Sequence, residues 1–174
     1  RDLHCRDTLS LHHALPISNE DVDFDLNKGE IHVLLGENGA GKTTLMNVLY
    51  GLYAQEAGDI FIKGNKVSIK NPKEAIDLGI GMVHQHFMLV HNFTVAQNMI
   101  LGNEPKKGLN LDINKAVSDT KALSQKYGFN IDPEAIIEDM TVGQQQKVEI
   151  LKALYRGAEI LILDEPTAVL TPQE

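Results

Sequence analysis

The stretch Gly36-Glu37-Asn38-Gly39-Ala40-Gly41-Lys42-Thr43-Thr44 decides the fold of this chain. It matches the phosphate-binding loop pattern G-x-x-x-x-G-K-[ST] at every fixed position. The apolar run at 31–35 (IHVLL) precedes the loop and predicts a buried strand, and apolar residues at 45–50 follow it at helical spacing. The pattern predicts a strand, a phosphate loop and a helix in succession. A glycine-rich turn without a ligand is the alternative.

The residue types of this loop suit phosphate binding. Glycines let the backbone turn sharply and aim successive N–H groups at a phosphate. The first turn of the following helix adds unpaired N–H groups and a partial positive charge. Lys42 would then neutralise the β and γ phosphates of a nucleotide, and the Thr43 hydroxyl would ligate Mg²⁺.

The composition is that of a globular protein, with 43% hydrophobic and 23% charged residues. The formal net charge of −8 argues against a role built on binding the nucleic-acid backbone. Cys5 is the only cysteine, so an internal disulfide is impossible and a reducing compartment is expected. No apolar stretch approaches the roughly 18 residues that a membrane-spanning helix needs, so we expect a cytosolic chain that meets a membrane only through partners.

Both ends of the chain are irregular. Residues 1–17 show no sustained periodicity, and 6–17 (RDTLSLHHALPI) resemble translated sequencing-adapter DNA joined to a gene fragment. We therefore expect a non-native or disordered tail at 1–17, with an ordinary divergent N-terminal strand as the alternative. The sequence stops ten residues after Asp164, which is abrupt for a domain whose chemistry centres there. We interpret 18–174 as a partial domain with a helical insert at about 89–140.

Periodicity and turn residues predict further elements along the chain. Alternating apolar residues predict a strand at 22–26, and 59–69 read as a hairpin with a turn around Gly64. A short helix is expected from Pro72 to Ile76, and a short strand at 79–83. Helices are expected at 95–100, after a Thr94 cap, and at 112–127.

A second motif combines the apolar run 160–163 (ILIL) with Asp164 and Glu165. An unbroken apolar run suits a parallel strand covered on both faces, and ligands bind at the carboxyl ends of such strands. Asp164 would hold the Mg²⁺ of a nucleotide, and Glu165 would polarise a water for attack on the γ phosphate. A strand that ends in two solvated acids is the alternative.

A third motif lies between the other two, at 140–147 (MTVGQQQK). Thr141 can cap a helix whose apolar face includes Val148 and Leu151. The helix start, the Thr141 hydroxyl and the Gln144 amide form a second anion site on one chain. One nucleotide does not easily need both sites, which suggests that the second site serves a nucleotide held by another copy.

The order of these motifs resembles the nucleotide-binding domain of ABC transporters. The phosphate loop at 36–44 is followed by a glutamine-bearing loop at Gln85, a signature at 140–144 and the acidic pair at 164–165. The usual signature is Leu-Ser-Gly-Gly-Gln, from which this chain departs at Met140 and Val142. The runs 82–87 and 141–151 are most similar to bacterial sugar and nucleoside importers, and 167–174 resemble the first of two fused cassettes. The resemblance covers about 20–174.

The resemblance implies an α/β fold of the P-loop NTPase type (ABC class), with a parallel core sheet, a small antiparallel β subdomain, a helical insert and a missing C-terminal part. In folds of this kind, a strand beyond Glu174 lies between the strands that end at Leu35 and Leu163. The chain also departs from the family in having no aromatic residue before Asn19 to stack on adenine.

The resemblance also implies roles for individual residues. Glu165 is the catalytic base, and Gln85, which senses the γ phosphate, belongs to both the catalytic and the metal-binding set. Mg²⁺ is held by Thr43 and Asp164 together with Gln85. Thr141, Gly143 and Gln144 contact ATP across a head-to-tail dimer. The ATP phosphates are bound by Gly36, Glu37, Asn38, Gly39, Ala40, Gly41, Lys42, Thr43 and Thr44.

The function implied is that of the ATP-hydrolysing subunit of a bacterial ABC importer for nucleosides or simple sugars, at the cytoplasmic face of the plasma membrane. Its expected partners are a second cassette fused in the full-length protein, permease subunits and, indirectly, a solute-binding protein, with no nucleic acid. The alternatives are a soluble ABC ATPase acting on ribosomes or DNA, and an inactive nucleotide-binding fragment.

Overall fold

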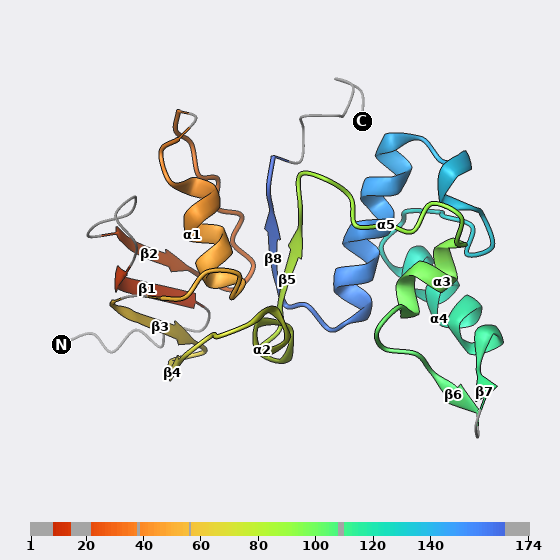
Figure 1. The fold of residues 1–174 in the computed structure, drawn as a ribbon, viewed down its shortest axis with the longest axis horizontal. Helices are drawn as coiled ribbons and strands as arrows, with labels where there is room; N and C mark the ends of the chain where they lie inside the picture. The colour runs from red at the N-terminus through yellow and green to blue at the C-terminus, as the bar shows by residue number, and fades with distance from the viewer. Residues whose placement is uncertain (1–8, 15–21, 38, 56, 108–109, 166–174) are drawn as a thin grey trace. The chain divides into compact units, whose positions relative to one another are not determined.

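The computed structural model describes residues 9–14, 22–37, 39–55, 57–107 and 110–165 (Figure 1). The chain divides into two compact units, Arg1–Leu78 and Gly79–Glu174. Each unit is described by itself below. No helix formed by the described residues is long and apolar enough to cross a membrane.

The first unit contains a four-stranded antiparallel sheet in the order β2-β1-β3-β4. The strands are β1 (Leu9–Ala14), β2 (Val22–Leu26), β3 (Asp59–Ile62) and β4 (Asn65–Val67). The predicted hairpin is confirmed: Lys63 and Gly64 both have positive φ, as a tight two-residue turn between twisted strands requires. Two helices, α1 (Lys42–Leu49) and α2 (Pro72–Asp77), complete this unit, and Asn71 caps α2.

Strand β1 lies inside the segment 1–17. It pairs with β2 on one side and with β3 on the other, so it occupies an interior position in the sheet. Leu9 at its start is buried. Residues 9–14 therefore form a paired strand, and the expectation of a non-native or disordered tail at 1–17 stays a prediction.

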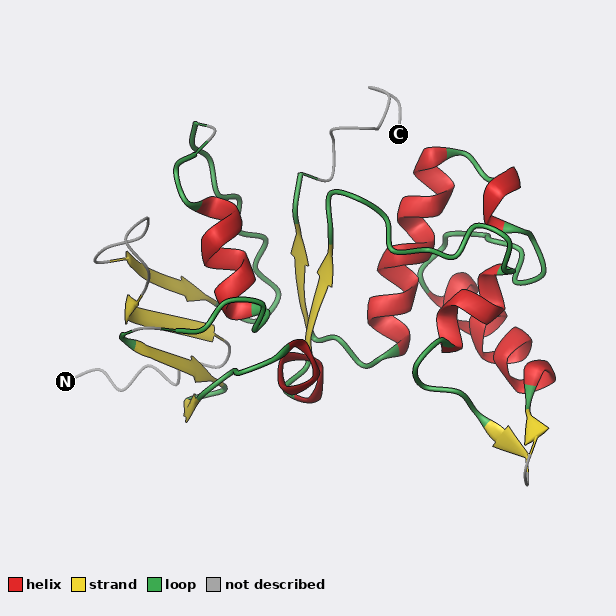
Figure 2. Ribbon diagram, viewed as in Figure 1, coloured by secondary structure: helices red, strands yellow, loops and turns green. Residues whose placement is uncertain are grey.

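The strand predicted at 31–35 is wrong for this structure. The segment is a loop between β2 and α1 (Figure 2), in which Ile31, Val33 and Leu35 are solvent-exposed, at 91%, 67% and 90%, and Leu34 is half-buried. A strand persists only where a neighbour satisfies its backbone N–H and C=O groups, and no described strand pairs with this one. Hydrophobicity alone suggested burial, but burial depends on a strand neighbour that the sheets formed by the described residues do not provide.

The second unit contains a parallel pair of strands, β5 (Ile80–Val83) and β8 (Ile160–Leu163), with Val83 opposite Leu163. The parallel pairing of β8 is as predicted, although Leu163 at its end is partly exposed. The helices are α3 (Val95–Ile100), α4 (Ile113–Lys126) and α5 (Val142–Tyr155), with a 3₁₀ turn at Ile137–Asp139. A short antiparallel pair of strands, β6 (Lys106–Lys107) and β7 (Asn110–Leu111), was not predicted.

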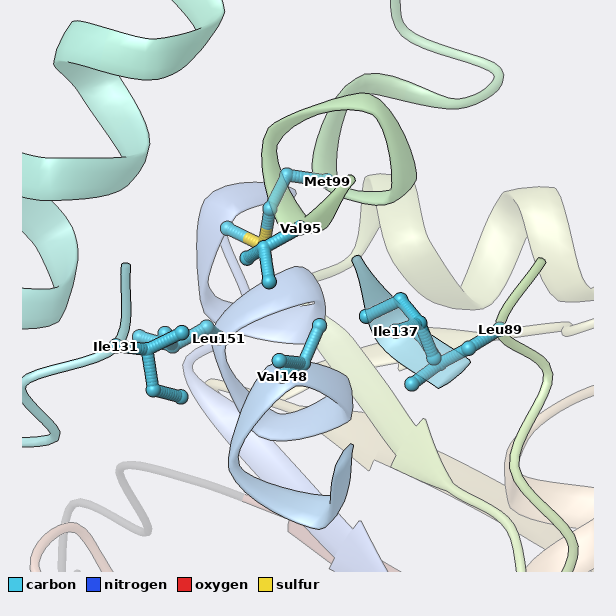
Figure 3. Packing of buried hydrophobic residues seen from close by; sticks show 7 residues of the cluster. All are labelled: Leu89, Val95, Met99, Ile131, Ile137, Val148 and Leu151. Carbon is cyan, nitrogen blue, oxygen red and sulfur yellow. The ribbon is translucent and has the colours of Figure 1, made fainter. Parts of the chain in front are cut away.

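A hydrophobic core holds α3 and α5 together (Figure 3). Val95 and Met99 from α3 meet Val148 and Leu151 from α5, all of them fully buried. The cluster is completed by three residues from loops and the 3₁₀ turn: Leu89, Ile131 and Ile137. This packing fixes the position of α5 and of the loop that follows β5.

Candidate functional site

The phosphate loop leads directly into α1 in the first unit. Gly39 and Gly41 have φ of 89° and 84°, a left-handed conformation that side chains other than glycine rarely adopt. Gly41 is the N-cap residue of α1 and has no side chain with which to occupy the start of the helix. Asn38 lies outside the described residues. The predicted loop-to-helix junction is therefore present where the sequence placed it.

Lys42 points back along this loop. Its Nζ donates to the carbonyl oxygens of Gly36 at 2.6 Å and Glu37 at 2.9 Å. An ammonium group has three donors and no acceptor, so Lys42 has the chemistry to donate to phosphate oxygens as well as to these carbonyls. The cation is held over the loop by the protein's own backbone.

Thr43 and Thr44 lie in the first turn of α1, where Thr43 is exposed and Thr44 is half-buried. The first turn carries no acidic residue that would oppose an anion. Helix N–H groups, the Lys42 ammonium and the Thr43 hydroxyl form a donor set that fits a phosphate group and an accompanying Mg²⁺.

In the second unit, the carboxyl ends of β5 and β8 bring two predicted site residues together. The Asp164 N–H donates to the Val83 carbonyl at 3.0 Å, which extends the parallel pairing by one step. One residue further, the Gln85 Nε2 donates to the Glu165 Oε2 at 2.7 Å. Residues 80 positions apart in the chain thus touch because the two strands end at the same edge.

Glu165 also has an unusual backbone conformation, with φ of 47°. A positive φ is uncommon outside glycine and costs of order 1–3 kcal/mol. Such strain persists only where the surroundings fix the residue, and it concentrates at functional sites. The strain and the Gln85 contact together single out this carboxylate.

The start of α5 is a capping box. Thr141 Oγ1 accepts from the Gln144 N–H at 3.3 Å, and Gln144 Oε1 accepts from the Thr141 N–H at 2.9 Å. Gly143 is buried beside them. The predicted cap is confirmed. It uses the side-chain oxygen Oε1 of Gln144, and the side-chain NH₂ group of Gln144 takes no part in the capping box.

Three buried polar side chains that the sequence reading did not single out hold the loop after Gln85. Glu149 and Lys152 on α5 bond the N–H and the carbonyl of Met88, and Asn98 on α3 bonds the backbone of Val90. The sequence does contain a signal for the burial of Lys152. This residue lies four residues after Val148 and one after Leu151, which places it near the apolar face of α5.

A profile of the ABC transporter family matches residues 19–168. The chain belongs to the ABC transporter family. It is 58% identical over 168 residues to the guanosine import ATP-binding protein NupO of Bacillus subtilis, which covers 95% of this chain and 33% of NupO. It is 60% identical over 158 residues to the nucleoside import ATP-binding protein NupA of Lactococcus lactis, which covers 91% of this chain and 31% of NupA.

The ABC chain therefore spans about a third of the length of these curated relatives. A crystal structure of another ABC transporter's ATP-binding cassette, in its ADP conformation, matches the fold with a TM-score of 0.82 at 22% sequence identity. That match covers 95% of this chain and 71% of the other. The expected fold class, a P-loop NTPase of the ABC type, is confirmed.

Proposed function

We propose that this chain is the ATP-binding and ATP-hydrolysing part of a bacterial ABC importer. The observation that carries the proposal is the contact between Gln85 and the strained Glu165 at the ends of two parallel strands. Both reported relatives have names that state nucleoside or guanosine import, so a nucleoside is the favoured solute and a simple sugar is the second choice.

In this mechanism the loop at 36–44 binds the triphosphate. Lys42 exchanges its contacts with the Gly36 and Glu37 carbonyls for oxygens of the β and γ phosphates. Thr43, Asp164 and Gln85 would hold Mg²⁺, which supplies charge neutralisation on the phosphates. The donor set of the loop and the carboxylate at the end of β8 suit these two roles.

Glu165 then acts on the attacking water. Gln85 holds Glu165 Oε2, so Oε1 is the oxygen that accepts the proton as the water attacks the γ phosphorus. The bond between that phosphorus and its bridging oxygen breaks, and ADP and phosphate are released. The amide of Gln85 keeps the carboxylate oriented throughout.

The partners follow from the same proposal. A second cassette, fused in the full-length protein, would present its phosphate loop to Thr141, Gly143 and Gln144 of this chain in a head-to-tail dimer. Permease subunits would place the pair at the cytoplasmic face of the plasma membrane, and a solute-binding protein would deliver the solute. Residues 18–174 would be part of one cassette, with a helical insert at about 89–140.

The decisive experiment replaces Glu165 by Gln. We expect ATP hydrolysis to slow by roughly 10²–10⁴, the usual worth of a general base, which is about 3–5 kcal/mol of barrier. Isothermal titration should still detect ATP binding with Mg²⁺. The control is Glu138→Gln, which changes an exposed carboxylate in the same unit.

Unchanged turnover in Glu165→Gln would contradict the assignment of the base, and no titration heat with ATP would indicate an inactive fragment. Salt-dependent binding to DNA or ribosomes would favour the nucleic-acid alternative over import. Uptake of labelled guanosine, competed by nucleosides and not by xylose, would separate nucleoside from sugar import.

A further inference from the structure

Glu149 and Lys152 bind the two backbone polar groups of a single residue, Met88. The Met88 N–H donates to Glu149 Oε1 at 2.6 Å, and Lys152 Nζ donates to the Met88 carbonyl at 3.0 Å. The two side chains lie three residues apart on α5 and therefore share a face of that helix. Together they satisfy both backbone groups of Met88, as a neighbouring strand would.

Asn98 on α3 repeats this arrangement two residues later. Its Oδ1 accepts from the Val90 N–H at 2.7 Å, and its Nδ2 donates to the carbonyls of Val90 at 3.0 Å and Thr94 at 3.1 Å. Residues 88–90 are thus anchored to two helices of the second unit. Met88 as a residue is 64% exposed, so its contacts with the helices are made by its backbone N–H and carbonyl.

The use of two charges for this purpose needs an explanation. Glu149 is 7% and Lys152 is 8% exposed, and burying such groups carries a desolvation cost. Burial lowers the pKa of Lys152, while the nearby Glu149 opposes the change and Arg156 adds to it. Neutral side chains could satisfy the same N–H and carbonyl at less cost, but hydrogen bonds to charged groups are shorter and stronger. The desolvation cost is thus offset by hydrogen bonds that hold the Met88 backbone firmly against α5.

The connection between α5 and the Met88 backbone joins two parts of the proposed site. Helix α5 begins at the Thr141 capping box, and Met88 is three residues from Gln85, a span of at most about 11 Å. We propose that Glu149 and Lys152 are positioning residues that transmit the position of α5 to the contact between Gln85 and Glu165. The inference rests on the proposed function, because Glu165 is the catalytic base only under that proposal. Through Glu149 and Lys152, the position of α5 would then align this base.

The test uses the 174-residue chain and two readouts that need no nucleotide. The first is hydrogen exchange of the Met88 amide. The second is the NMR resonance of the Gln85 side-chain amide. Its reference position is measured in Glu165→Ala, which lacks the carboxylate that accepts from Gln85. Variants are Glu149→Ala, Glu149→Gln and Lys152→Met, with Glu138→Ala and Lys121→Met as exposed controls of the same charges.

In Glu149→Ala we expect Met88 exchange to accelerate by roughly 10- to 100-fold, the effect of losing a charge-assisted hydrogen bond, while the amides of Val148 and Leu151 stay protected. The Gln85 resonance should shift toward its position in Glu165→Ala. Glu149→Gln retains an acceptor and should restore both readouts. In ATP hydrolysis, Glu149→Ala should lower kcat and leave KM for ATP unchanged.

Faster Met88 exchange with an unmoved Gln85 resonance would overturn the proposal, because the pair would then serve structure alone. If Glu149→Ala does not fold, Lys152→Met decides on the same readouts, and loss of fold in both variants would also overturn it. A chain that shows both NMR effects and binds no ATP would leave the positioning role intact and refute the proposed function instead.

Discussion

The capping boxes of α3 and α5 provide a matched test of the proposed site. Thr94 Oγ1 accepts from the Gln97 N–H at 3.2 Å, and Thr141 Oγ1 accepts from the Gln144 N–H at 3.3 Å. In return, each threonine backbone N–H donates to the side-chain Oε1 of its glutamine, at 2.9 Å in both boxes. The same motif therefore starts two helices of one unit, and only the second is assigned a role in nucleotide contact.

Replacing either threonine by alanine removes one cap. Such a loss costs about 1 kcal/mol, with a range of roughly 0.5–2. For a chain of this size, 1 kcal/mol corresponds to a fall in Tm of roughly 2–4 °C. Thr94 is half-buried and Thr141 is exposed, so Thr94→Ala should lower the Tm by at least as much as Thr141→Ala.

The effects on ATP turnover should differ. If the Thr141 hydroxyl contacts a nucleotide phosphate, its loss removes a hydrogen bond to a charged group, worth about 1.5–3 kcal/mol or roughly 10- to 150-fold in rate. The assay is steady-state phosphate release by the assembled transporter, with Thr141→Ser as the variant that keeps the hydroxyl. Equal losses of turnover in Thr94→Ala and Thr141→Ala would refute the reasoning, because helix stability would then explain both.

Gly51 and Gly64 have the same φ of 76°, so the substitutions Gly51→Ala and Gly64→Ala form a matched pair. An added Cβ at Gly51 would lie 2.7 Å from the Asn71 backbone, whereas one at Gly64 would meet nothing within 4 Å. Urea unfolding should show Gly51→Ala to be the less stable by roughly 1–3 kcal/mol, and equal stability would contradict the packing argument. Lys42→Met should weaken ATP binding at least about 10-fold in titration calorimetry while leaving the Tm of the chain nearly unchanged; unaltered affinity would count against the loop. Burial lowers the pKa of Lys152 from 10.5, so just below that pH the unfolded chain binds more protons and stability rises with pH. In urea unfolding, the free energy of unfolding of Lys152→Met should rise less steeply with pH than that of the unsubstituted chain. An identical pH dependence in the two chains would contradict this.

Local signals predicted local structure well. The hairpin around Gly64 and the helix cap at Thr141 each depend on a few neighbouring residues, and both formed as expected. The phosphate loop is of the same kind, since its glycines dictate its backbone. These features need no distant partner, so the sequence alone was sufficient for them.

Features that depend on distant partners were harder to predict. The apolar segment 31–35 resembles a buried strand in sequence, but whether it pairs is decided by another strand. Glu149 and Lys152 look like solvated charges on a helix, and only the loop around Met88 explains their burial. The contact between Gln85 and Glu165 likewise arises from the parallel register of β5 and β8, which neither segment encodes alone.

The charged groups of the proposed site are satisfied by the protein in two different ways, which has consequences for catalysis. Lys42 is held by two carbonyls that a phosphate must replace, so its contribution to affinity is the difference between two sets of hydrogen bonds. Glu165 is held through one oxygen by Gln85, a bond that can persist while the other oxygen takes up a proton. Under the proposed function, exchange of partners at Lys42 would set the affinity for the nucleotide, and retention of a partner at Glu165 would support the chemical step. Substitutions of Lys42 and of Glu165 are therefore expected to change different quantities, the affinity and kcat respectively.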